Sequence, residues 1–91
     1  MQLRWSPAAA IDMEDIYSYL RHNHPSFAVP TMRRIYAAAN ELSTFPSKGR
    51  KGRIPDTREL VLAPLPYIVV YAVEGEHVHI FRIVHGAQDW V

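Results

Sequence analysis

The stretch PYIVVYAV, residues 66–73, constrains the fold more than any other part of the chain. β-Branched and aromatic residues dominate it, and apolar side chains occupy both sets of alternating positions. A strand with this pattern is buried on both faces, as strands at the centre of a sheet are. We therefore predict that residues 66–73 form a central strand with a neighbour on each side.

Two flanking stretches fit the neighbouring strands. RELVLA, residues 58–63, comes before the central strand, and HVHIFRIVH, residues 77–85, comes after it. The glycine-containing EGE at residues 74–76 predicts a hairpin turn between the last two strands. The short links favour an antiparallel meander, and MQLRW, residues 1–5, predicts a short strand at the edge of the sheet.

Between the first and second predicted strands, the apolar spacing is that of helices. Ser6 can cap free N–H groups and Pro7 suits the first helical position, so a helix is predicted to begin there. It should end near Pro25, because proline disfavours helical geometry in the residue before it. The apolar stripe of this helix consists of Ala9, Met13, Ile16, Tyr17 and Leu20.

A second helix is predicted to follow after a short link and to end before Pro46. Ser26 is a candidate cap, but Pro30 fits only a first helical turn, so the start is open by several residues. Two helices joined by so short a link form an antiparallel hairpin. The residues at helical spacing are Met32, Ile35, Tyr36, Ala38, Ala39 and Leu42.

These elements predict one α+β domain over residues 1–91, in the order β-α-α-β-β-β. The helix hairpin packs on one face of an antiparallel sheet. Two helices can cover only one face, so the other face is expected to be bare and to bind another molecule.

Composition excludes several kinds of chemistry. The chain has no cysteine, which rules out disulfides, a thiolate nucleophile and a cysteine-based zinc site. His77 and His79 share a strand face but lack further ligands, so we expect no metal and no cofactor. No apolar run has the length of a membrane span, and the N-terminus lacks the apolar region of a signal peptide. We therefore expect a cytoplasmic protein with no membrane partner.

The positive charge is concentrated in FPSKGRKGRIPDTREL, residues 45–60. The chain has a net charge of only +1, yet half of its ten lysines and arginines lie here. The cations of this basic segment are Lys48, Arg50, Lys51, Arg53 and Arg58. The segment is either a surface for an acidic partner or a solvated turn in which Gly49 and Gly52 permit the bend.

The order and spacing of three motifs resemble the RelE/ParE superfamily of toxins. The motifs are GRIPDTREL at residues 52–60, PYIVVY at residues 66–71 and HGAQDW at residues 85–90. The resemblance implies the toxin of a type II toxin–antitoxin module, held in a hetero-oligomer by a cognate antitoxin. RelE-like members cleave mRNA in the ribosome, whereas ParE-like members inhibit DNA gyrase. The fold serves both branches and cannot decide between them.

The two branches assign different roles to the same residues. In the RelE-like alternative, a ribosome-dependent endoribonuclease, Arg58, Arg82 and His85 would be catalytic. Three features favour the ParE-like branch, which requires no catalytic residue. They are the TREL and HGAQxW motifs, the low net charge and the lack of a tyrosine after Tyr71. The candidate residues for binding gyrase or nucleic acid are Lys48, Arg50, Lys51, Arg53, Arg58 and Trp90. The candidate antitoxin contacts are Tyr67, Tyr71 and Phe81.

Four of these residues also have a purely structural interpretation. His85 could be a half-buried histidine at a strand end, with no chemistry to perform. Trp90 could cover the edge of the core, and the two tyrosines at 67 and 71 could belong to the core itself.

Overall fold

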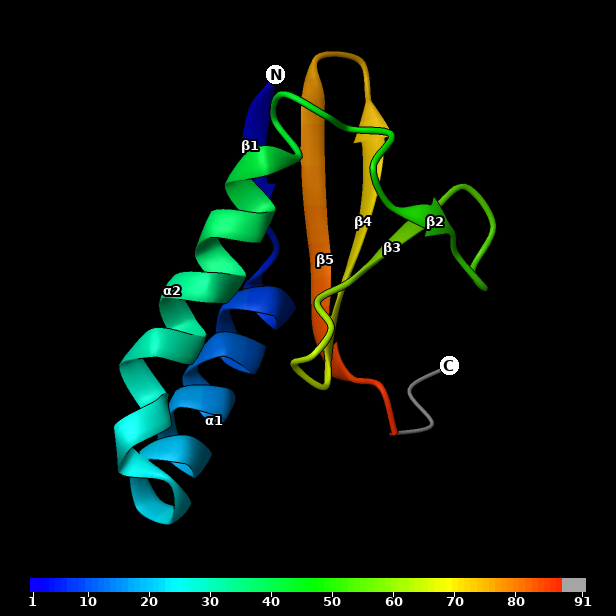
Figure 1. Ribbon diagram of the computed structural model, residues 1–91. Coiled ribbons are helices and arrows are strands. Elements are labelled where there is room, and N and C mark those ends of the chain that lie inside the picture. Colours follow the sequence, from blue (N-terminus) through cyan, green and yellow to red (C-terminus); the bar gives the residue numbers. More distant parts are fainter. Residues whose placement is uncertain (88–91) are drawn as a thin grey trace.

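The computed structural model describes residues 1–87 and has the predicted order of elements with one addition (Figure 1). The extra element is a two-residue strand, β2, inside the basic segment. The elements are β1 (Gln2–Trp5), α1 (Pro7–Asn23), α2 (Pro25–Glu41), β2 (Arg50–Lys51), β3 (Arg58–Val61), β4 (Tyr67–Glu74) and β5 (His77–His85). Neither helix in this part of the chain is long and apolar enough to cross a membrane.

The five strands form one sheet in the order β1-β5-β4-β3-β2. The prediction of a central strand is confirmed, because residues 67–72 of β4 are all buried. The predicted α+β class is confirmed. One detail of the sheet was wrong: β1 runs parallel to β5, so the sheet is mixed, while the other pairs are antiparallel. The EGE turn is confirmed, with Gly75 in the left-handed region at φ 58°, which glycine adopts without strain.

The start of α1 follows the prediction. The Oγ atom of Ser6 accepts a hydrogen bond from Ala9 N at 2.9 Å, and Pro7 is the first helical residue. Ala9 and Met13 are buried against the sheet. The assignment of Tyr17 to the buried stripe is wrong, because 37 % of its surface is exposed.

α2 begins earlier than Ser26 and contains Pro30 in its interior. The proposed Ser26 cap is therefore wrong: His24 precedes the helix and its side chain makes no capping hydrogen bond. Ile35 is fully buried, whereas Tyr36 is exposed on one side and packs on Trp5, with ring centroids 5.3 Å apart. Figure 1 shows the two helices side by side along the same face of the sheet.

The main core lies between the helix hairpin and the sheet. Its fully buried members include Ile35, Leu42, Val69, Tyr71, Val78 and Ile80.

The opposite face of the sheet is not bare at its centre, so that prediction is wrong there. Ile68, Val70 and Val84 form a second cluster whose members are only 1–6 % exposed. The strand register explains part of this burial, since it places Ile68 beside Val84 and Val70 beside Glu59, which binds two arginines. Only the margins stay open, with Val61 44 % and Val73 39 % exposed.

Candidate target-binding surface

The first part of the basic segment is attached to the core through one phenol group. Tyr71 on β4 is fully buried, and its hydroxyl donates a hydrogen bond to the carbonyl of Pro46 at 2.7 Å. The same oxygen accepts a hydrogen bond from Gly49 N at 2.8 Å. Burial raises the pKa of Tyr71, and the bond from Gly49 and the nearby charge of Arg58 offset this only in part. The loop thus has a fixed position relative to the central strand.

Arg58 supports the same loop. Its guanidinium donates hydrogen bonds to the carbonyls of Gly49 at 2.7 Å and Ser47 at 3.3 Å. Arg58 and Glu59 follow one another on β3, so their side chains point to opposite faces of the strand and bind different partners. In this structure Arg58 holds the loop in place.

The two glycines of the basic segment are required for close approach rather than for the bend. Neither glycine has a left-handed φ; among the glycines of residues 1–87, only Gly75 has one. A Cβ atom on Gly49 would lie 2.7 Å from the hydroxyl oxygen of Tyr71, and one on Gly52 would lie 2.3 Å from Oγ1 of Thr57. The loop packs so tightly at both positions that no side chain fits without movement.

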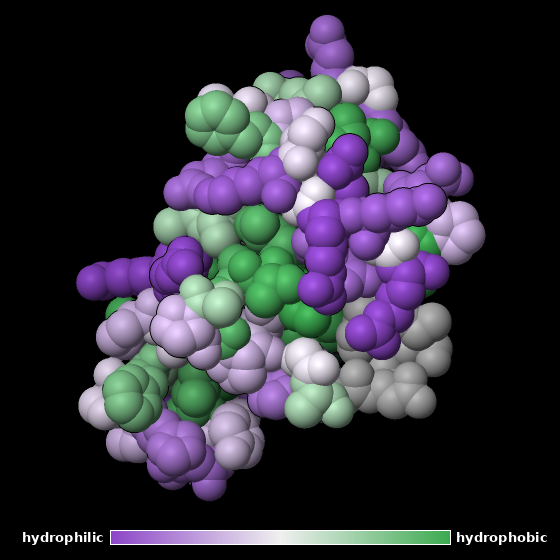
Figure 2. Space-filling model, turned by 45° about the vertical axis from the view of Figure 1, so that its right-hand side comes forward, coloured by the Kyte–Doolittle hydropathy of each residue, from purple (hydrophilic) through white to green (hydrophobic). Residues whose placement is uncertain are grey.

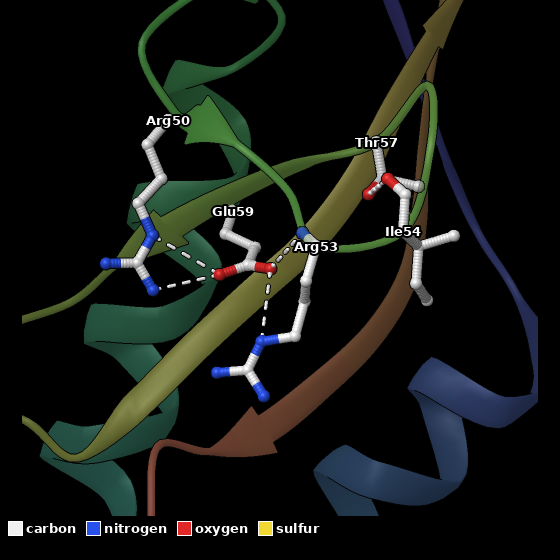
Figure 3. A network of polar contacts seen from close by, with 5 residues as sticks. All are labelled: Arg50, Arg53, Ile54, Thr57 and Glu59. Carbon is white, nitrogen blue, oxygen red and sulfur yellow. Dashed lines mark hydrogen bonds and ion pairs between the residues drawn. The ribbon is translucent and has the colours of Figure 1, made fainter. Parts of the chain in front are cut away.

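The second part of the basic segment surrounds a buried carboxylate (Figure 3). Glu59 on β3 is 3 % exposed, and its Oε1 accepts hydrogen bonds from Nη2 of Arg50 at 2.9 Å and Nε at 3.2 Å. Its Oε2 accepts one from the backbone N of Arg53 at 2.9 Å, with Nε of Arg53 at 3.9 Å. One carboxylate therefore fixes the side chain of Arg50 and the backbone of Arg53, and the two arginine side chains are each about half exposed.

Glu59 remains ionised because its partners outweigh its burial. Burial by itself would raise the pKa of Glu59, but the hydrogen bonds from Arg53 and Arg50 and the charges of both arginines lower it below its ordinary value of 4.5. At neutral pH the cluster therefore holds one negative charge between two positive ones.

Acidification should remove the stability that Glu59 supplies. A carboxyl whose pKa is lower in the folded chain stabilises the fold above its unfolded pKa and loses this contribution as the pH falls through the folded pKa. Because both arginines are half exposed, we expect the contribution to be about 1 kcal/mol at neutral pH. Urea unfolding from neutral to about pH 3 should show a steeper loss for the wild type than for Glu59→Gln. Parallel curves would contradict this role of Glu59.

The two lysines of the basic segment, Lys48 and Lys51, differ in their surroundings. Lys48 forms an exposed ion pair with Glu41, at the end of α2. Lys51 is exposed, and within residues 1–87 its side chain has no hydrogen-bond or ion-pair partner. The exposed positive charge of the segment is therefore centred on Arg50, Lys51 and Arg53.

Of the candidate catalytic residues Arg58, Arg82 and His85, the last two border one cleft, and Arg58 is not among the residues that line it. Arg82 binds both carboxylate oxygens of Asp12 on α1, at 2.7 and 2.9 Å. The hydrogen bond to Asp12, with the charge of that carboxylate, raises the pKa of Arg82. His85 lies at the end of β5, edge-on to Tyr67 at 5.8 Å between ring centroids.

A cleft of about 750 Å³ lies between the end of the helix hairpin where α1 joins α2 and the end of the sheet where β4 begins and β5 finishes. Figure 2 shows the molecule from the side of β2 and β3, with hydrophobic surface between long hydrophilic side chains. Arg82 and His85 border the cleft, whereas Arg58 is not among its lining residues. Its apolar walls include Ile16, Leu20, Phe27, Leu65 and Tyr67.

The three candidate antitoxin contacts differ in accessibility. Tyr71 is fully buried, so it cannot touch a partner in this structure and its role is structural. Tyr67 is 8 % exposed and lines the cleft. Phe81 is half-buried and stacks on His79, with ring centroids 6.3 Å apart. Contacts of Tyr67 and Phe81 with an antitoxin stay a prediction, and Trp90 lies outside the described residues.

The two histidines near Phe81 have ordinary polar neighbours. His77 Nε2 lies 3.0 Å from an amino nitrogen of Arg4, and His79 lies 3.6 Å from a carboxylate oxygen of Glu74. Among residues 1–87 no three histidine or acidic side chains are grouped closely enough to hold a metal ion.

Sequence reasoning did not predict the functions of Asp12 and Glu59. Asp12 lies beyond the first turn of α1 and binds β5 through Arg82 and the backbone N of Ile83. For Glu59 a usable pattern was present, since an acid on the strand is flanked by Arg50, Arg53 and Arg58 in the sequence.

Comparison with known proteins places these features in a family. The family model for the ParE toxin of type II toxin–antitoxin systems matches residues 3–90 of the sequence. The candidate toxin Y4kP of Sinorhizobium fredii is 37 % identical over 98 % of this chain and 92 % of its own. Toxin RelE2 of Caulobacter vibrioides is 36 % identical over 96 % of this chain and 97 % of its own.

Solved structures agree with the sequence comparison. A chain of the chromosomal ParDE system of P. aeruginosa superposes with a TM-score of 0.84 at 27 % identity, over 93 % of this chain and 95 % of its own. A YoeB/ParE toxin of Agrobacterium tumefaciens has the same fold, with a TM-score of 0.60 at 14 % identity over 93 % of this chain and 98 % of its own. The chain therefore belongs to the ParE family of toxins of type II toxin–antitoxin modules.

Proposed function

We propose that this toxin poisons DNA gyrase and that its antitoxin suppresses this activity. The family match over residues 3–90 carries the proposal. Family membership makes the protein a toxin of a type II module, which implies an antitoxin partner. Gyrase as the target follows from the resemblance to the ParE-like branch.

The positions of the arginines favour gyrase over RNA cleavage. Cleavage without a metal needs cations that face the scissile phosphate. Arg58 donates to two loop carbonyls, and Arg82 donates to both oxygens of Asp12. Both guanidiniums are thus held by other groups of the chain, and Arg58 is absent from the lining of the cleft that Arg82 and His85 border, so the three candidate residues do not share one cleft. The similarity to Toxin RelE2 keeps the ribosome-dependent endoribonuclease as the second candidate.

The experiment compares the two targets with one preparation of toxin. We expect purified toxin to abolish supercoiling of relaxed plasmid by gyrase and to accumulate linear plasmid, which reports trapped double-strand breaks. A cell-free translation reaction with the same toxin should yield intact mRNA. Added antitoxin should restore supercoiling. Full supercoiling at a stoichiometric excess of toxin would reject the proposal, and mRNA cleavage in the translation reaction would support the second candidate.

An Arg82→Ala variant sharpens the distinction. Arg82 would be catalytic in the endoribonuclease, whereas no catalytic residue is required in the gyrase poison. If the variant remains folded, it should retain inhibition of gyrase within about threefold, because the lost contact with Asp12 is a partly exposed ion pair. Loss of toxicity in cells with intact folding would instead indicate RNA cleavage.

A further inference from the structure

The cluster of Glu59 with Arg50 and Arg53 contains a buried negative charge, which is unusual for a purely structural contact. Glu59 lies beside Val70 on β4, and Val70 is 1 % exposed. An apolar side chain at position 59 would cover this part of the sheet without the cost of burying a charge, and such replacements are often neutral or stabilising. A buried carboxylate at this position is therefore poorly explained by stability alone.

The geometry of the cluster suits a bound phosphate group. A guanidinium has five N–H donors, and Arg50 uses its Nε and one Nη2 donor on Glu59, so three point elsewhere. The Arg50 and Arg53 side chains are 57 % and 47 % exposed. Arg50 lies on β2, so its base is fixed by the sheet. Arginine forks held in this way recognise phosphate oxygens with directed hydrogen bonds.

Charge and composition point to a nucleic-acid backbone rather than to bases. Glu59 cancels one of the two arginine charges, so the cluster keeps one net positive charge at the surface, while Lys51, which pairs with Arg58 on β3, points to the other face of β2. The sequence KGRKGR, residues 48–53, contains no aromatic side chain on which a base could stack. Contacts of this type position a protein on DNA without reading its sequence.

We propose that Arg50 and Arg53 bind the phosphodiester backbone of duplex DNA and that Glu59 is the positioning residue, which holds the Arg50 guanidinium by two hydrogen bonds and the Arg53 backbone by one. The proposal rests on the proposed function, in which gyrase supplies the bound DNA. The proposal includes Glu59, whose negative charge by itself opposes DNA binding. Removal of this charge should nevertheless weaken binding, which is the opposite of what charge alone predicts.

The test measures binding of the wild-type toxin and of Glu59→Gln to a short fluorescein-labelled DNA duplex of mixed sequence, by anisotropy at several salt concentrations. The substitution raises the net charge from +1 to +2. Simple electrostatics therefore predicts tighter binding. We expect the opposite, a weakening of about fivefold, because the Arg50 side chain and the backbone at Arg53 must then be ordered on binding.

Glu41→Gln is the matched control. It also adds one positive charge and also breaks an ion pair of the same segment, but Glu41 and Lys48 are both exposed. Binding by this variant should be unchanged or slightly tighter. Arg50→Lys is the second test variant, because it keeps the charge but lacks the fork, and it should weaken binding to a similar extent. Thermal unfolding of each variant establishes that it is folded.

Duplex binding decides this inference, and the gyrase assay decides the proposed function. Tighter binding by folded Glu59→Gln, equal to that of Glu41→Gln, would overturn the inference, as would wild-type binding to single-stranded RNA with none to duplex DNA. If wild-type toxin leaves gyrase active but binds duplex DNA in the predicted order, only the proposed function fails.

Discussion

Replacement of Gly49 by alanine should lower the free energy of unfolding by about 3 kcal/mol, because overpacking of a tight site is combined with the loss of buried hydrogen bonds. The added Cβ would lie 2.7 Å from Oη and 2.8 Å from Cε1 of Tyr71, and 3.0 Å from the carbonyl oxygen of Glu59. The tyrosine cannot move aside, since it is fully buried and bonded at its hydroxyl.

Thermal unfolding is the measurement for Gly49→Ala. For a domain of this size the change corresponds to a fall in Tm on the order of 15 °C. Gly86→Ala is the matched control: a Cβ there would meet its nearest atom at 3.5 Å, an ordinary contact, and the effect should be within about 0.5 kcal/mol. Equal Tm values for the two variants would show that the loop adjusts freely around Tyr71.

Replacement of Asp12 by alanine should lower the free energy of unfolding by about 2 kcal/mol, because the change leaves a part-buried backbone donor without its acceptor. Asp12 accepts hydrogen bonds from Ile83 N at 2.9 Å and from two nitrogens of Arg82. β1 pairs with β5 only at residues 77–80, so the second half of β5 has no strand on that side. Ser6 and Asp12 occupy this edge: the Ser6 hydroxyl donates to Phe81 O at 2.8 Å.

Hydrogen exchange gives a direct local readout for Asp12. The amide of Ile83 should exchange faster in Asp12→Ala than in the wild type, whereas Asp12→Asn, which keeps one acceptor oxygen, should lose only about half as much stability. Asp15→Ala removes the same charge from an exposed position of α1 and should change stability by less than about 0.5 kcal/mol. Unchanged exchange at Ile83 would reject the role of Asp12 as an edge acceptor.

The strands and the first helix were predictable because local patterns specify them. The run of apolar residues placed β4 within one residue at each end, and the predicted range 77–85 coincides with β5. Ser6 and Pro7 placed the start of α1. β2 could not be predicted, because two charged residues carry no periodic pattern and form a strand only by pairing with β3.

The candidate site was less predictable, because its contacts join distant parts of the chain. The basic segment was found from charge density alone, but its shape depends on Tyr71, which is 22 residues from Gly49. The pairing of Asp12 with Arg82 spans 70 residues. A buried acid in a cationic segment, such as Glu59, is a pattern that can be sought in related sequences, whereas the strand register that buries it cannot be read from composition.

The placement of α1 against β5 also limits how the molecule can self-associate. Backbone groups that would otherwise template a foreign chain are already occupied there by Ser6, which caps α1, and by Asp12 in the second turn of that helix. Within residues 1–87 the margins without a strand partner are each short: the outer sides of the four-residue β1 and the two-residue β2, residues 60–61 of β3, and residues 72–74 of β4. Margins this short are poor nuclei for intermolecular β-structure, so we expect the toxin to withstand aggregation when it is separated from its antitoxin.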